Sequence, residues 1–284
     1  MSPATLRRRA MRGFTLVEAI VVMVITGILA TVVAVFVTAP VQMYTDAVAR
    51  AELTDAADQM LRRIAREIQL ALPNSVRVSA DGQSLELIPV KTAARYYSND
   101  YAGTGTALDW SSTSNKSFTI AGVVPSGKEA IAAGDSIVIY NLGQGITNAD
   151  AYAGGNRAAV ASASGSTITM SSNVFAAQGS TQFMSPANVF YVVNQPVMFR
   201  CTPGANGSGN MRRYWNYGWN ASLSTPSGGQ SALMAMRITS CTFAVSNIAT
   251  TRSGLILLQV TMEANNNKDG PITLVHQVHV DNTP

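Results

Sequence analysis

"RGFTLVEAIVVMVITG", residues 12–27, begins a long apolar run that continues to Ala39. The 26 residues of 14–39 contain a single charged side chain, Glu18. About 20 apolar residues are enough for a helix to span the hydrocarbon of a bilayer. Because a carboxylate inside that hydrocarbon opposes insertion by roughly 2.5–3.5 kcal/mol on the mildest scales, we expect Glu18 to have a function.

The charges around the apolar run predict its orientation. Four arginines precede it, Arg7, Arg8, Arg9 and Arg12, whereas the first charge after it is Asp46. Basic flanks stay on the cytoplasmic side, so the N-terminus is expected inside and the remainder exported. Without the first thirteen residues the chain carries 16 basic and 16 acidic residues, which gives no reason to expect nucleic-acid binding.

Gly13 lies before the apolar core, whereas an ordinary signal peptide is cleaved after it. Cleavage at Gly13 removes the arginines and leaves the apolar helix attached. This arrangement resembles the prepilin signature of type IV pilins and type II secretion pseudopilins. The resemblance implies a leader at 1–13, cleavage by a prepilin peptidase, N-methylation of Phe14, and pairing of Glu18 with the cationic N-terminus of a neighbouring subunit. The alternative is a simple anchor whose Glu18 reaches the headgroups.

The helix is expected to continue beyond the apolar run. Residues 14–39 form its membrane-spanning half and 40–74 its soluble half, which Pro40 could bend. Met60, Ile64 and Ile68 recur at helical spacing, so one face is expected to pack on the chain's own sheet. Pro73 and Asn74 are expected to end the helix.

From residue 75 the apolar period becomes two, which predicts strands. Asp81-Gly82 is expected to turn a hairpin directly after the helix. The predicted strands are 75–79, 84–90, 118–124, 136–140, 160–162, 167–170, 189–193, 197–200, 234–244, 254–263 and 272–280, with loops at 204–209 and 224–229. The predicted fold is α+β and pilin-like: a long N-terminal helix packed on a C-terminal antiparallel sheet domain, 75–284, with a variable insert rich in Gly, Ser and Ala at about 98–184.

Two cysteines, Cys201 and Cys241, lie in the exported part, where oxidising conditions favour a disulfide between them. His276 and His279 are three apart on a predicted strand and therefore point to opposite faces, which argues against a metal site. Calcium near Asp135 and Asp150 is a weaker alternative. Nucleophile, phosphate-loop and metalloprotease motifs are missing from the sequence, so we expect no catalytic residues, no cofactor, no metal and no enzyme activity.

The segment "YWNYGWN", residues 214–220, contains four aromatic side chains: Tyr214, Trp215, Tyr217 and Trp219. Packing within the domain is the favoured interpretation. The alternative is a surface that contacts a partner pilin or stacks on sugar rings.

Several stretches resemble minor pilins of the mannose-sensitive haemagglutinin (MSHA) type IV pilus, namely "RAELTDAAD", "ALPNSVRV", "LELIPV", "ARYY", "FRC", "CTF" and "HQVHVDNTP". This resemblance implies a non-catalytic priming or tip subunit that contacts the prepilin peptidase, the inner-membrane assembly platform, other minor pilins and the major pilin. It also implies a single-pass protein of the inner membrane with a periplasmic C-terminal domain, which then enters the pilus. A type II secretion pseudopilin and a membrane-anchored adhesin are the alternatives.

Overall fold

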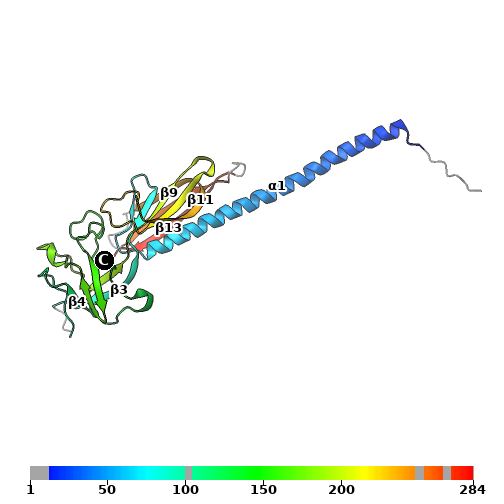
Figure 1. Cartoon of the computed structure of the whole chain (residues 1–284). Coiled ribbons are helices and arrows are strands. Elements are labelled where there is room, and N and C mark those ends of the chain that lie inside the picture. The colour runs from blue at the N-terminus through cyan, green and yellow to red at the C-terminus, as the bar shows by residue number, and fades with distance from the viewer. Residues whose placement is uncertain (1–12, 100–103, 247–252, 265–269, 284) are drawn as a thin grey trace, which may run out of the picture. The chain divides into compact units, whose positions relative to one another are not determined.

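The computed structural model describes residues 13–99, 104–246, 253–264 and 270–283. The chain divides into two compact units, Met1–Ala51 and Glu52–Pro284. Helix α1, Leu16–Gln69, begins in the first unit and ends in the second (Figure 1). Strands β1 to β13 all belong to the second unit.

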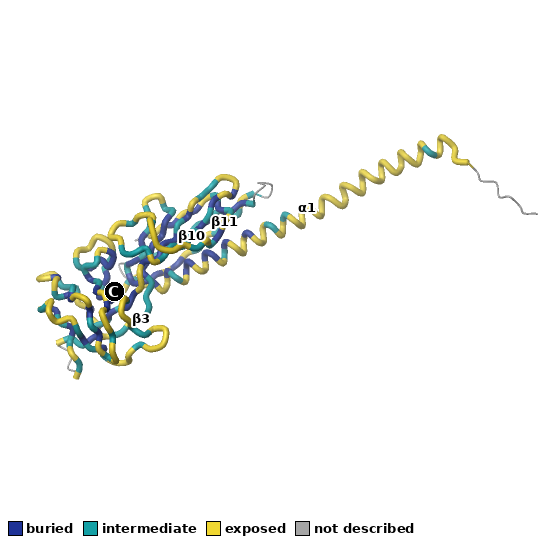
Figure 2. The backbone as a smooth tube through the Cα atoms, in the orientation of Figure 1, coloured by how far each residue is buried: buried dark blue, intermediate teal, exposed yellow. Residues whose placement is uncertain are grey.

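The first unit contains the apolar part of α1. Among the described residues, one helix, α1, is long enough and apolar enough to cross a bilayer. Its most apolar window has a mean hydropathy of 3.0 and contains no buried residue. Figure 2 shows this part of the helix as almost entirely exposed. The hydroxyls of Thr26, Thr31 and Thr38 each donate to a carbonyl one turn earlier, so these polar side chains need no solvent partner. Pro40 lies inside α1 without interrupting it.

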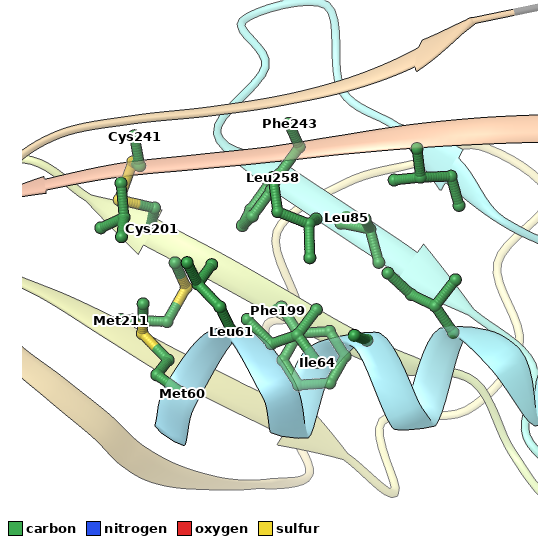
Figure 3. Packing of buried hydrophobic residues seen from close by; sticks show 14 of the residues in the cluster. Met60, Leu61, Ile64, Leu85, Phe199, Cys201, Met211, Cys241, Phe243 and Leu258 are labelled. Carbon is green, nitrogen blue, oxygen red and sulfur yellow. A yellow bond between two sulfur atoms is a disulfide. The ribbon is translucent and has the colours of Figure 1, made fainter. Parts of the chain in front are cut away.

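In the second unit, one face of α1 is buried. The predicted stripe is confirmed, because Met60, Ile64 and Ile68 are all buried. Their side chains pack with residues from the sheet into one hydrophobic core. In Figure 3, Met60, Leu61 and Ile64 point from the helix toward the sheet, from which Leu85, Phe199, Met211, Phe243 and Leu258 are also labelled.

A seven-stranded antiparallel sheet supplies the other side of this core. Its spatial order is β1-β2-β9-β10-β11-β12-β13. The strands are β1 Arg77–Val78, β2 Ser84–Leu87, β9 Val197–Thr202, β10 Gly209–Trp215, β11 Gln230–Ser246, β12 Ser253–Met262 and β13 Ile272–Asp281. In β12, Ile256, Leu258 and Val260 alternate onto the buried face, as period-two patterning predicts for a half-buried strand.

Six further strands form a closed antiparallel barrel in the order β3-β4-β7-β6-β5-β8. They are β3 Val90–Tyr96, β4 Ser117–Ala121, β5 Ser136–Val138, β6 Arg157–Ser164, β7 Thr167–Met170 and β8 Val189–Val193. Short 3-10 helices lie at Gly127–Glu129, Ala176–Gln178 and Ala205–Gly207. The barrel has its own core, in which Phe118 meets Phe190 edge to face and Trp110 contacts Phe175.

The barrel is inserted between two neighbouring strands of the sheet. β2 and β9 pair directly, with Leu87 opposite Val197, although the whole barrel lies between them in sequence. A third buried cluster lies where the helix and the sheet lead into the barrel. Leu72 follows α1, Ile88 lies between β2 and β3, and the barrel with its β5–β6 connection supplies Val138, Tyr152 and Val193. The two β-structures of the second unit are therefore packed together rather than only linked by the chain.

The structure confirms the α+β fold of one long helix on an antiparallel sheet and corrects several boundaries. The helix ends at Gln69, before Pro73, because Ala71 already pairs with Pro89 and Leu72 N–H donates to the Ile88 carbonyl. The predicted strand 84–90 is two strands, since β2 ends at Leu87 and β3 turns into the barrel. The predicted variable insert at about 98–184 contains most of the barrel, and the four strands predicted inside it correspond to β4, β5, β6 and β7. β10 was not predicted.

Candidate functional site

The start of α1 brings together Gly13, Phe14 and Glu18. Thr15 caps the helix, because its Oγ1 accepts a hydrogen bond from the Glu18 N–H at 3.3 Å. Glu18 thus lies in the first helical turn, where the helix dipole favours a negative charge. An ideal Cβ added to Gly13 meets no described atom within 4 Å, and Phe14 is 73% exposed.

Glu18 is exposed, and no ion pair to it forms within residues 13–99, 104–246, 253–264 and 270–283. The surrounding side chains of α1 are apolar and exposed, including Val17, Val21 and Val22. In hydrocarbon, a carboxylate in this setting is stable only when an opposite charge or hydrogen-bond donors come close. The geometry therefore leaves Glu18 available to a cation from outside the described chain.

The predicted disulfide joins Cys201 and Cys241. Cys201 lies on β9 and Cys241 on β11, two strands that β10 separates in the sheet order. The bond is buried in the core under α1 (Figure 3). Closing a loop of 40 residues stabilises the fold by roughly 4 kcal/mol in the chain-entropy description.

The aromatic segment, residues 214–220, begins on β10 and leaves the sheet after Trp215. Tyr214, Trp215, Tyr217 and Trp219 are all half-buried. Tyr217 Oη donates to Glu86 Oε1 at 2.6 Å. Glu86 lies on β2 and is only 1% exposed, so the aromatic segment is tied to the sheet through a buried carboxylate.

Glu86 also forms an ion pair with Arg77, directly opposite on β1. Arg77 Nη1 and Nη2 donate to the Ala221 and Asn220 carbonyls at 2.7 and 2.8 Å, so the charge pair fixes the backbone at the end of the aromatic segment. Burial raises the pKa of Tyr217 far above its ordinary value, and the negative charge of Glu86 raises this pKa further. Tyr217 therefore remains a hydrogen-bond donor at all physiological pH values.

Two cation–π contacts connect this network to the barrel part of the chain. The guanidinium of Arg77 lies 3.6 Å from the ring centre of Tyr152, whose Oη donates to the Ser75 carbonyl at 2.8 Å. Arg157 of β6 lies 3.8 Å from the ring centre of Trp219. Tyr217 and Trp219 thus have partners inside the molecule, which favours packing as their role.

The roles of Arg77, Glu86 and Tyr152 in this network were not predicted from the sequence. A signal for the first two exists, since a hairpin turning at Asp81-Gly82 places Arg77 opposite Glu86. No local signal identifies Tyr152, which is 77 residues from the Ser75 carbonyl that it contacts.

The remaining candidates do not converge on a metal site. His276 is half-buried and His279 is exposed, on opposite faces of β13. Asp135 binds Lys91 Nζ at 2.7 Å, and Asp150 accepts the N–H groups of Gly145 and Tyr152. In the part of the chain that the structure describes, no three His, Cys, Asp or Glu side chains gather where they could hold a metal ion.

The N-terminal part of the chain matches a known family motif. Residues 8–34 match the prokaryotic N-terminal methylation motif, a segment that covers the basic flank, Gly13, Phe14, Glu18 and the first part of α1. No curated protein and no solved structure matches the chain. The motif supports the pilin and pseudopilin family, and with it processing by a prepilin peptidase and assembly with other pilins. A single apolar N-terminal helix that follows this motif fits anchoring in the inner membrane.

Proposed function

We propose that this protein is a non-catalytic minor pilin of an MSHA-like type IV pilus, which acts in priming or at the tip of the fibre. The observation that carries the proposal is the continuity of α1. One helix begins at the methylation motif, has an unburied apolar half, and ends with a face buried on an antiparallel sheet. In this proposal the apolar half holds the subunit first in the inner membrane and then among neighbouring helices.

In this proposal, each motif residue at the N-terminal end of α1 has a role in processing or assembly. Prepilin peptidase cuts after Gly13, Phe14 becomes the methylated N-terminus, and Glu18 pairs with the N-terminal ammonium of an adjacent subunit. The exposure of Phe14 and the absence of an ion pair to Glu18 in the described residues support this assignment. The MSHA-like stretches quoted above support the choice of pilus, and the assembly platform and major pilin are the implied partners.

A pseudopilin of a type II secretion system has the same helix and motif, so it is the rival within the family. Deletion of the gene distinguishes the two. We expect loss of surface pili with normal secretion of exoproteins, whereas the rival predicts the reverse.

Replacing Gly13 tests the processing step without disturbing the fold. A side chain at residue 13 meets no described atom within 4 Å, so Gly13→Leu should leave the folded domain unchanged and still block cleavage. Immunoblots should then show only the longer precursor, and the strain should lack pili. Normal cleavage of Gly13→Leu would contradict processing at this site; Gly27→Leu, also in open space, is the matched control.

A further inference from the structure

The strand β13, Ile272–Asp281, is the outermost strand of the seven-stranded sheet, at the end opposite β1. It pairs with β12 over all ten of its residues and without a bulge. We propose that the edge of β13 that faces away from β12 is the docking site for an extended strand of a different pilin subunit. The kind of partner rests on the proposed function, whereas the edge itself is a property of the fold.

The backbone of β13 can bond a second strand along this edge. A strand directs its N–H and C=O groups alternately to its two sides, so about half of those of β13 face away from β12. Within the described ranges, no residue outside β12 forms a backbone hydrogen bond with β13. A row of donors and acceptors at strand spacing is matched by the backbone of another extended chain, as in partners that bind by strand addition.

The other strand edges in the described part of the second unit are protected. At the opposite end of the sheet, β1 has only two residues. The second half of β11 extends beyond β10, and there the Phe243 N–H donates to the Gly82 carbonyl at 2.7 Å, so the β1–β2 turn covers part of it. The barrel is closed and therefore has no edge. By contrast, β13 is long and contains no Lys, Arg or Pro, which would oppose pairing with another strand.

Apolar side chains in the first part of β13 are incompletely covered. Ile272 and Leu274 pack against the main core but are only half-buried, and Val275 on the other face is 56% exposed. Further along the strand, Val278 is buried. A strand paired with residues 272–277 would cover the three exposed or half-buried side chains. We therefore expect apolar residues at alternate positions of the partner strand.

The geometry of the sheet favours a different subunit over a second copy of this chain. Antiparallel pairing of β13 with itself relates two copies by a two-fold axis, so the α1 segments packed on the two sheets would run in opposite directions. Two subunits anchored in one membrane by the same end of α1 cannot pair in this way. Parallel pairing would turn the second sheet over and place its polar Thr273 and Gln277 beside the apolar Ile272 and Leu274.

Photo-crosslinking in intact cells, followed by hydrogen exchange, tests the proposal. Gln277 is exposed, so p-benzoylphenylalanine in its place should react with a bound strand without disturbing the core. Mass spectrometry should locate the cross-link in an extended segment of another pilin. In the isolated complex, the outward backbone amides of 272–277 should exchange about tenfold or more slowly than in the purified chain in detergent.

Charge on the edge should prevent docking. Val275→Lys and Thr273→Lys, both at exposed positions, should each lower the cross-link yield about tenfold, because a lysine on an edge opposes strand addition. Gln259→Lys is the matched control, since Gln259 lies directly opposite Val275 on β12, one strand away from the edge. This variant should cross-link normally, and Thr273→Lys keeps the test valid if Val275→Lys does not fold.

The proposal is overturned if no cross-link forms, if it joins two copies of this chain, or if the amides of 272–277 exchange equally fast in the complex and in the purified chain. It is also overturned if Gln259→Lys lowers the yield as much as Val275→Lys. Presence of the protein in sheared pili with unprotected β13 amides would remove the docking strand and leave the pilin assignment standing. Protection of β13 by a protein that is not a pilin would overturn the proposed partner.

Discussion

Glu18 lies in the first turn of α1, among apolar side chains. Its backbone N–H is satisfied by Thr15, so the carboxylate is not needed to begin the helix, and no described residue pairs with it. We therefore expect Glu18→Gln to be cleaved normally and to assemble poorly, because only the partner charge is lost. Pilus counts and co-purification with other pilins measure the defect, with the cleavage state checked on the same samples.

Thr26→Val is a matched control for this change, because its hydroxyl bonds only within its own helix, to the Val22 carbonyl at 2.6 Å. Full assembly of both Glu18→Gln and Glu18→Ala would rule out the pairing role of this carboxylate in the subunit.

Tyr217 and Tyr214 give a second comparison of single residues. Tyr217→Phe leaves the buried Glu86 carboxylate without one donor, which should lower the free energy of unfolding by about 1–3 kcal/mol. Tyr214 makes no side-chain hydrogen bond among the described residues, so Tyr214→Phe should change the free energy of unfolding by no more than about 0.5 kcal/mol. Chemical denaturation of the full chain in detergent measures both, and equal effects would contradict the role assigned to Tyr217.

At the residue scale, sequence reading succeeds where the signal is local or covalent. Glu18 is conspicuous within an apolar run, and Cys201 and Cys241 are the two cysteines of the chain. The link from Tyr217 to Glu86 was not predictable, because 131 residues separate them and only the completed fold brings them together. Trp215 was recognised as part of an aromatic group, but its place beside the Arg213 guanidinium depends on the path of β10.

At the scale of elements, α1 changes its role along its length. Ile64 is 0% exposed in the core, whereas Ile28 is 59% exposed in the apolar half. Ile64→Ala should lower the free energy of unfolding by about 2–5 kcal/mol, since it leaves a cavity. Ile28→Ala should leave that free energy within about 0.5 kcal/mol, because no described residue buries this side chain.

Denaturant titration of both variants, monitored by tryptophan fluorescence, measures the difference, because all tryptophans lie in the second unit. Equal losses in the two variants would contradict the division of α1 into an assembly half and a core half.

The elements themselves were predictable to different degrees. The apolar run and the stripe of Met60, Ile64 and Ile68 are strong local patterns, so the helix was predicted over nearly its whole length. Its end was misplaced because the pairing of Ala71 with Pro89 stops it before the proline does. β10 was missed because a glycine-rich stretch and an aromatic cluster hide a strand whose partners, β9 and β11, define it.

At the scale of the whole molecule, the segment that connects two adjacent strands of the sheet, β2 and β9, forms a complete barrel. The residues between β2 and β9 gave only short and weak strand signals, because closure of a barrel depends on pairings far apart in sequence, such as β3 with β8. The pilin-like arrangement was predictable because it is specified by one helix and a few strongly alternating strands. Closure of the barrel was not predictable, although five of its strands were expected near their observed positions.

The central claim is that the apolar helix enters a pilus after cleavage at Gly13. Mass spectrometry of the N-terminal peptide, from this protein isolated in sheared surface pili, tests it most directly. The expected peptide begins at Phe14 and carries one added methyl group on the α-amine, and the leader, residues 1–13, is absent. A mature N-terminus at any other residue, or a processed protein that stays in the membrane of normally piliated cells and never appears in sheared pili, would contradict the account.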